Sequence, residues 1–119
     1  MSLAAAHATA FYREVASARR VWTVRDAKGF PAPVTSDGRR AQPFWSSESR
    51  ARRIVESVAA YAGMEVVGIE WDVFRDRWLP GLQADGLLVG VNWSGERATG
   101  YDVEADQVRA NVEGQLGRA

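Results

Sequence analysis

The sequence has no cysteine, one histidine and one lysine among its 119 residues. The missing thiols exclude disulfides, thiolate zinc sites and cysteine nucleophiles. His7 has no second histidine with which to share a metal, and it falls in an N-terminal helix predicted to fray, so we predict a solvated side chain. The sequence also has no G-x-S-x-G, Walker or G-x-G-x-x-G motif. We therefore favour a non-enzymatic protein with no catalytic residue, no metal site and no cofactor.

Long apolar runs and an excess of one charge are absent too. No run reaches the ~20 apolar residues of a membrane span. The N-terminal stretch MSLAAAHATAFYREVASA lacks the basic segment and the long apolar stretch of a secretory leader. The 15 basic residues balance 15 acidic ones, whereas nucleic-acid binding favours a net basic domain. We expect a cytoplasmic protein that binds neither membranes nor nucleic acid.

The composition that is present is typical of one folded domain, with 46% hydrophobic and 25% charged residues. A chain of this length supports one core, so we predict a single domain over residues 1–119, with residues 1–5 frayed. The fold class is α+β, with a mostly antiparallel sheet of five or six strands. Two long helices are expected on one face of the sheet, together with one or two shorter helices.

Apolar spacing predicts the positions of the helices. Six residues repeat at helical intervals and predict a helix that begins after Ser46 or Ser47 and ends at Gly63: Ala51, Ile54, Val55, Val58, Ala59 and Ala62. Similar stripes predict helices over residues 4–18 and from residue 105 onward. A short helix is expected after Asp72, stopped by Pro80 and Gly81.

Strands are expected over residues 21–24, 30–34, 41–45, 65–71, 87–91 and 99–103. The first three should form an antiparallel meander, with Pro31 and Pro33 kept to a sheet edge because proline cannot donate a ladder hydrogen bond. The run Leu87–Val91 is almost wholly apolar, which predicts a buried central strand followed by a turn at residues 92–95.

Two groups of carboxylates are candidate sites, and both have a simpler interpretation. Asp102, Glu104 and Asp106 follow the spacing of a calcium-binding loop, but Gln107 stands where that loop needs glycine. We interpret them as charges at the start of the last helix. Asp72 and Asp76 lie four residues apart and are interpreted as a cap and a surface ion pair rather than an acid–base pair.

Tryptophan and arginine supply the candidate binding residues. Trp45, Trp71 and Trp93 each end a predicted strand, so two of them sharing an exposed patch would mark an interaction surface. Arginines cluster at three places, which suggests an anion clamp or a face that meets an acidic partner. The candidate ligand- or partner-binding residues are Trp45, Trp78, Trp93, Arg39, Arg40, Arg52 and Arg53.

Several motifs occur in an order that resembles a known family. They are Val21-Trp22, Asp26 with Gly29, Pro43-Phe44-Trp45-Ser46-Ser47, Phe74, Trp78-Leu79-Pro80-Gly81-Leu82, Asp85-Gly86 and Val91-Asn92. Over about residues 11–112 the chain resembles the bacterial family catalogued as domain of unknown function 2750. The resemblance implies a small bacterial cytosolic protein with no assigned activity and no catalytic residues to transfer. A more distant likeness links it to immunity and secretion-associated α+β domains.

Two functional hypotheses follow. The first is an uncharacterised, tryptophan-rich protein-interaction or regulatory protein, immunity-like, that acts through an unknown protein partner. The alternative is a small-molecule-binding protein or enzyme, with a cleft lined by Trp45, Trp78 and Trp93 and an anion clamp at Arg39 or Arg40. A homodimer formed through the unprotected edge of the last strand is a further hypothesis about partners.

Overall fold

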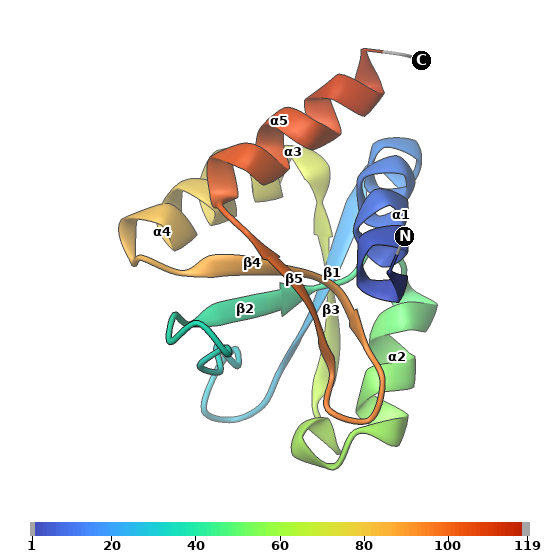
Figure 1. Ribbon diagram of the computed structural model, residues 1–119, viewed down its shortest axis with the longest axis vertical. Helices are drawn as coiled ribbons and strands as arrows, with labels where there is room; N and C mark the ends of the chain where they lie inside the picture. The colour runs from blue at the N-terminus through green and yellow to red at the C-terminus, as the bar shows by residue number, and fades with distance from the viewer. Residues whose placement is uncertain (1, 118–119) are drawn as a thin grey trace.

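Five strands form two small sheets in the computed structural model, which describes residues 2–117 (Figure 1). The helices and strands follow one another as α1 (Leu3–Ala18), β1 (Arg20–Arg25), β2 (Ala41–Phe44), α2 (Glu48–Ser57), η1 (Ala59–Tyr61), β3 (Glu65–Glu70), α3 (Trp71–Val73), η2 (Phe74–Trp78), α4 (Leu79–Ala84), β4 (Leu88–Ser94), β5 (Thr99–Val103) and α5 (Ala105–Leu116). The α+β class is confirmed. In residues 2–117 no helix has the length and apolar composition needed to cross a membrane.

The prediction of one five- or six-stranded sheet is wrong. β1 pairs antiparallel with β3, while β4 pairs parallel with β2 on one side and antiparallel with β5 on the other. Within residues 2–117, the only backbone hydrogen bonds between the two sheets are those that Trp22 and Trp45 exchange, at 2.8 and 2.7 Å. Pro43 has no N–H to extend that ladder, and its carbonyl oxygen accepts from the Thr23 hydroxyl at 2.9 Å instead. A side-chain bond therefore replaces the backbone pairing that would have fused the sheets.

The predicted meander is wrong as well. Of residues 30–34, only Val34 forms a bridge, with Arg40, because Pro31 and Pro33 cannot donate. The long helices do not share one sheet face either. α1 and α5 pack together against the three-stranded sheet, whereas α2 packs against β1 and β3 (Figure 1).

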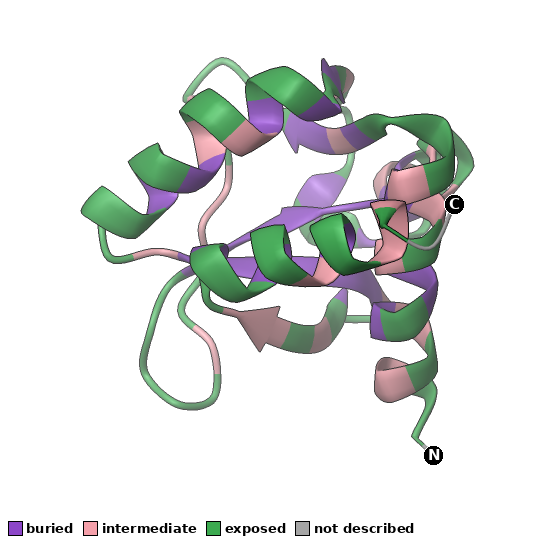
Figure 2. Ribbon diagram, turned by 90° about the horizontal axis from the view of Figure 1, so that it is seen from above, coloured by how far each residue is buried: buried purple, intermediate pink, exposed green. Residues whose placement is uncertain are grey.

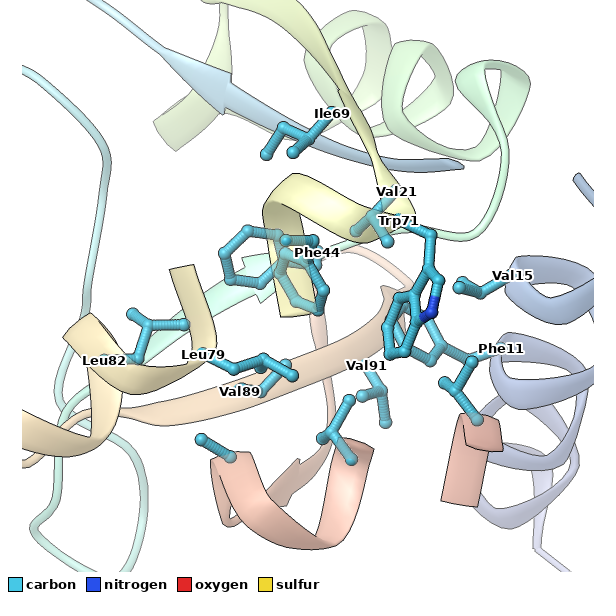
Figure 3. Close-up of a cluster of buried hydrophobic side chains, with 14 of the residues drawn as sticks. Phe11, Val15, Val21, Phe44, Ile69, Trp71, Leu79, Leu82, Val89 and Val91 are labelled. Atoms are coloured by element: carbon cyan, nitrogen blue, oxygen red, sulfur yellow. The ribbon is translucent and has the colours of Figure 1, made fainter. Parts of the chain in front are cut away.

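The core divides into two clusters that follow this arrangement. The larger lies between α1, α5 and the three-stranded sheet, where Trp71 is directed toward Phe11 and Val15 of α1 (Figure 3). The smaller joins α2 to the ends of β1 and β4. Buried positions line the strands and the inner faces of the helices, and exposed positions cover the outer faces (Figure 2). The buried central strand is confirmed, since β4 is buried from Leu88 to Trp93. The turn predicted at residues 92–95 is displaced, because β4 continues to Ser94 and the turn follows at residues 95–98.

The helix predicted to run to Gly63 ends five residues earlier than its apolar stripe. α2 stops at Ser57, Val58 is extended, and the 3-10 turn η1 follows. This break turns Tyr61 into the core at 5% exposure and leaves the small Ala59 outside. Burial of an aromatic ring removes far more apolar surface from water than burial of a methyl group. The larger side chain thus overrides the regular spacing.

Pro80 does not stop a helix, contrary to the prediction. One helical segment runs from Trp71 to Ala84, and its middle part, Phe74–Trp78, is π-helical. Proline in an α-helix loses one hydrogen bond and clashes with the carbonyl four residues earlier. The wider π turn just before Pro80 relaxes both constraints, and proline then occupies the first turn of α4.

Candidate functional site

A bulge in β4 brings Trp93 to the centre of the candidate site. The pairing with β5 shifts between Val91 and Ser94, and Asn92 adopts a left-handed φ of 51°. In a regular strand residues 90 and 93 would point to opposite faces, because side chains alternate. The bulge instead places the Trp93 ring over Gly90, where a Cβ would lie 2.3 Å from Cε2 of the ring. Asn92 thus re-aims the indole, which is a common role of bulges near binding sites.

The Asn92 side chain fixes the bulge by joining three separate segments. Its Oδ1 accepts from the Ser46 backbone N–H at 2.9 Å, and its Nδ2 donates to the His7 carbonyl oxygen at 3.1 Å. Nδ2 also lies 2.9 Å from the Ser46 hydroxyl. These bonds tie α1 and the start of α2 to β4. A buried amide with its donors and acceptor satisfied is rigid, so the left-handed residue is held in place.

An ion pair between α1 and α2 supports the same corner. Arg50 donates to Glu14 through Nε at 3.1 Å and through Nη2 at 3.0 Å, and the Ser46 hydroxyl donates to Glu14 at 2.7 Å. The Arg50 hydrogen bond lowers the pKa of Glu14 below its ordinary value. Two-point contact makes this pair geometrically specific.

The floor of the site is aromatic and almost fully buried. Trp45 is fully buried and Trp93 is 4% exposed. The Trp45 indole donates to the Trp93 carbonyl oxygen at 2.9 Å, and the Trp93 indole donates to the Asp102 carboxylate at 2.9 Å. Both rings are thereby fixed by their polar edges as well as by packing.

A pocket of about 250 Å³ opens above this floor, between α1, α2 and the β4–β5 turn, which lies beside α2 (Figure 1). We call it the His7–Arg53 pocket. Its walls are His7, Trp45, Arg50, Arg53, Ile54, Ser57, Asn92, Trp93, Ser94, Gly95 and Glu96. Arg50 and Arg53 fall three residues apart on α2, a spacing that places both on one face of the helix.

The polar groups in this pocket retain capacity to bind. Arg53 is exposed and makes no ion pair within 4.0 Å in the part of the chain that the structure describes. Arg50 donates to Glu14 through its Nε–H and one Nη2–H, so three of its five N–H donors remain for a ligand. The His7 ring lies 3.1 Å from the Ser94 hydroxyl through Nδ1. Glu96, on the β4–β5 turn, adds one negative charge to the lining.

The sequence profile of one protein family, described as "Protein of unknown function (DUF2750)", matches residues 8–112. The chain belongs to the DUF2750 family. The resemblance read from the sequence is therefore confirmed. A comparison with curated proteins gives no match. The DUF2750 span contains every residue that lines the His7–Arg53 pocket except His7 itself.

In this DUF2750 protein only three of the seven predicted site residues lie together. Trp45, Trp93 and Arg53 line the His7–Arg53 pocket. Trp78 lies elsewhere, with its ring edge-on to Phe30 and Phe44 at centroid distances of 5.0 and 5.9 Å.

The other three arginines already have partners elsewhere in the structure. Arg39 pairs with Glu104 across 65 positions, the Arg40 guanidinium donates to the Ala32 carbonyl at 3.0 Å, and Arg52 pairs with Glu48 one helical turn away. The cleft expected from Trp45, Trp78 and Trp93 therefore does not form as one unit. No two of the strand-ending tryptophans share an exposed patch either, because Trp45, Trp71 and Trp93 are all buried.

Sequence reasoning missed His7, Arg50 and Asn92. His7 is half-buried rather than fully solvated, because α1 is capped at Ser2, whose hydroxyl accepts from Ala5 N at 3.1 Å, and packs on β4. Arg50 resembles any other surface arginine until Glu14 is found beside it. Asn92 carried a usable signal, since asparagine within an apolar strand is unusual and tolerates the left-handed region.

Proposed function

We propose that this protein binds a small carboxylate with a flat apolar body in the His7–Arg53 pocket. The observation that supports the proposal is that Arg53 and Arg50, which has N–H donors to spare, line the same pocket as the apolar side chains of Trp45, Ile54 and Trp93. Guanidinium groups match the two oxygens of a carboxylate, and aromatic floors favour flat ligands. An apolar cavity of about 150 Å³ accommodates benzene. A pocket of about 250 Å³ has room for a ring and a carboxylate.

Binding without chemistry is the form of this proposal that the pocket supports best. Ser94 and His7 are 3.1 Å apart, as a nucleophile and its base would be. A catalytic pair of this kind also has a third group that orients the histidine. Within residues 2–117, the only side-chain hydrogen bond of the His7 ring is the one to Ser94. We therefore assign His7 to ligand contact rather than to proton transfer.

Benzoate is a suitable probe, followed by calorimetry or by the amide and indole signals in two-dimensional NMR. Arg53→Gln should weaken benzoate binding roughly tenfold or more, since a charge-assisted hydrogen bond contributes about 1.5–3 kcal/mol. Glu96→Gln should strengthen it by removing a like charge, and benzamide should bind more weakly than benzoate. Arg52→Gln is the matched control, because Arg52 lies next in sequence but is paired with Glu48 away from the pocket. Equal benzoate affinity for Arg53→Gln and wild type would contradict the proposal.

The protein-interaction role, immunity-like, is a second proposal, supported by the exposed arginines of α2. Arg52 and Arg53 are both exposed on this helix, and Arg53 also lines the His7–Arg53 pocket. Reversal of both charges to glutamate should release an acidic partner recovered from lysate by affinity capture. Recovery of the same partner in the same amount would count against it. Dimerisation through the edge of β5, which pairs only with β4 in the described sheets, is testable by light scattering.

A further inference from the structure

A second pocket, of about 310 Å³, is also lined by Trp93 and lies between η1, the β4–β5 hairpin and the segment before β2. We call it the Tyr61–Asp102 pocket. The lining residues that matter here are Val34, Tyr61, Trp93, Arg97, Thr99 and Asp102. It shares only Trp93 with the His7–Arg53 pocket, so the two are separate sites.

Asp102 is an unusual group in this lining. It is half-buried in β5, and its Oδ1 accepts from the Trp93 indole at 2.9 Å. Among the described residues no arginine, lysine or histidine nitrogen lies within 4.0 Å of its carboxylate. Burial raises the pKa of Asp102, and the negative charge of Asp37 raises it further. The protein thus holds a carboxylate by one neutral hydrogen bond and leaves it without a counter-ion.

We infer that the Tyr61–Asp102 pocket binds a small alkylammonium ion, with Asp102 as the counter-ion and with Tyr61 and Trp93 as its aromatic walls. An ammonium ion restores the charge balance of Asp102 in a partly desolvated place, where ion pairs are stronger than in water. Aromatic walls attract cations as well as apolar stems. Val34 and the ring of Tyr61 provide the apolar surface that such a stem would cover.

An ammonium ion fits these residues better than a metal ion does. Hard divalent cations take six or more oxygen ligands, often from several carboxylates. Among the described residues no group of three or more potential metal-ligating side chains is found. Arg97 also lines the pocket, but it is exposed and acts as a like charge that weakens the binding of any cation. Asp102 should therefore strengthen the binding of an ammonium ion and Arg97 should weaken it, and a substitution of each residue tests its effect separately.

The test is an NMR titration of the folded protein with n-butylammonium chloride at constant ionic strength. The reporter is the Trp93 indole N–H, assigned through Trp93→Phe, because its proton lies on the Asp102 carboxylate. Butylammonium should shift this signal to saturation, and butan-1-ol, which is neutral, should not. Asp102→Asn keeps an oxygen acceptor for the indole but removes the charge, and should weaken butylammonium binding roughly tenfold or more. Arg97→Gln should strengthen it.

Two controls separate this inference from folding effects and from the proposed carboxylate site. Asp106→Asn removes an exposed carboxylate from the first turn of α5 and should leave butylammonium binding unchanged. Arg53→Gln should also leave it unchanged, because Arg53 lines the other pocket. Unchanged signals from the other four indoles in Asp102→Asn would show that the variant is folded. Wild-type affinity for butylammonium in folded Asp102→Asn, or an equal shift with butan-1-ol, would overturn the inference.

Discussion

Gly90→Ala is the substitution that tests the architecture of the bulge most directly. The new methyl group would lie 2.3, 2.5 and 2.6 Å from three atoms of the Trp93 ring, far inside ordinary contact distance. The ring has little freedom to move. A Cβ built on Gly100 would lie only 3.0 Å from the ring, so Gly100 packs closely against it, and the Asp102 carboxylate accepts a hydrogen bond from the indole N–H. Overpacking of a well-packed core destabilises by about 1–3 kcal/mol. With three close atoms and a clamped ring, we expect about 3 kcal/mol.

Urea denaturation followed by circular dichroism measures this loss, and a thermal melt should show a fall of about 12 °C, at about 4 °C per kcal/mol for a chain of this size. Gly114→Ala in α5 is the matched control. A Cβ there meets nothing within 4 Å, so alanine should stabilise by about 0.5–1 kcal/mol. In a Trp93→Leu background, Gly90→Ala should have a much smaller effect. A Gly90→Ala protein within 0.5 kcal/mol of wild type would refute the packing argument.

Three further predictions concern the two pockets and the residues that support them. Asn92→Ala should lower the free energy of unfolding by about 2–3 kcal/mol, because it removes hydrogen bonds and puts alanine at a left-handed φ. Glycine adopts this φ without strain, so Asn92→Gly should be about 1 kcal/mol more stable than Asn92→Ala in the same denaturation assay. Arg50 lowers the pKa of Glu14, so ionised Glu14 stabilises the folded protein. The free energy of unfolding of wild type should therefore exceed that of Glu14→Gln above the unfolded pKa of about 4.3. This difference should disappear as pH falls through the lower pKa of the folded state. Asp102 has a raised pKa, so the stability of Asp102→Asn relative to wild type should rise with pH from about 3.9 through the raised folded value. The opposite pH dependence of these two variants is measurable in one set of melts, and parallel profiles would contradict both assignments.

Local patterns predicted the strands and most helices because spacing and turn residues act over a few positions. β4 follows from its continuous apolar run, and α1 and α5 follow from their apolar stripes. The failures arose where a distant partner decides the outcome. The sequence pattern alone does not show that Pro43 would interrupt the backbone hydrogen bonds between β1 and β2, or that β2 would pair parallel with β4.

The site was harder to predict than the fold for the same reason. Trp45 and Trp93 of the predicted cleft line one pocket, but the arginine beside them is Arg53 rather than the predicted Arg39 or Arg40. Arg39 is paired with Glu104 instead. Arg39 and Glu104, 65 positions apart, cannot be matched by any local rule. His7 lies near Ser94 only because α1 packs across β4, a contact set by the whole core.

The strand pairing has a consequence for how this chain reaches its native state. Partners in the two sheets are far apart in sequence, 40 positions for Arg25 and Glu65 and 47 for Phe44 and Val91. None of the pairs that define β1–β3 or β2–β4 can form by a local hairpin, so the entropy of closing long loops precedes the gain from pairing. Domains that depend on such distant pairings fold more slowly than helical bundles, whose contacts are local. In the two described sheets only the β4–β5 pairing is local, and β4 also carries the Asn92 bulge and Trp93. The first strand pairing to form would therefore be the one around which both pockets are later built.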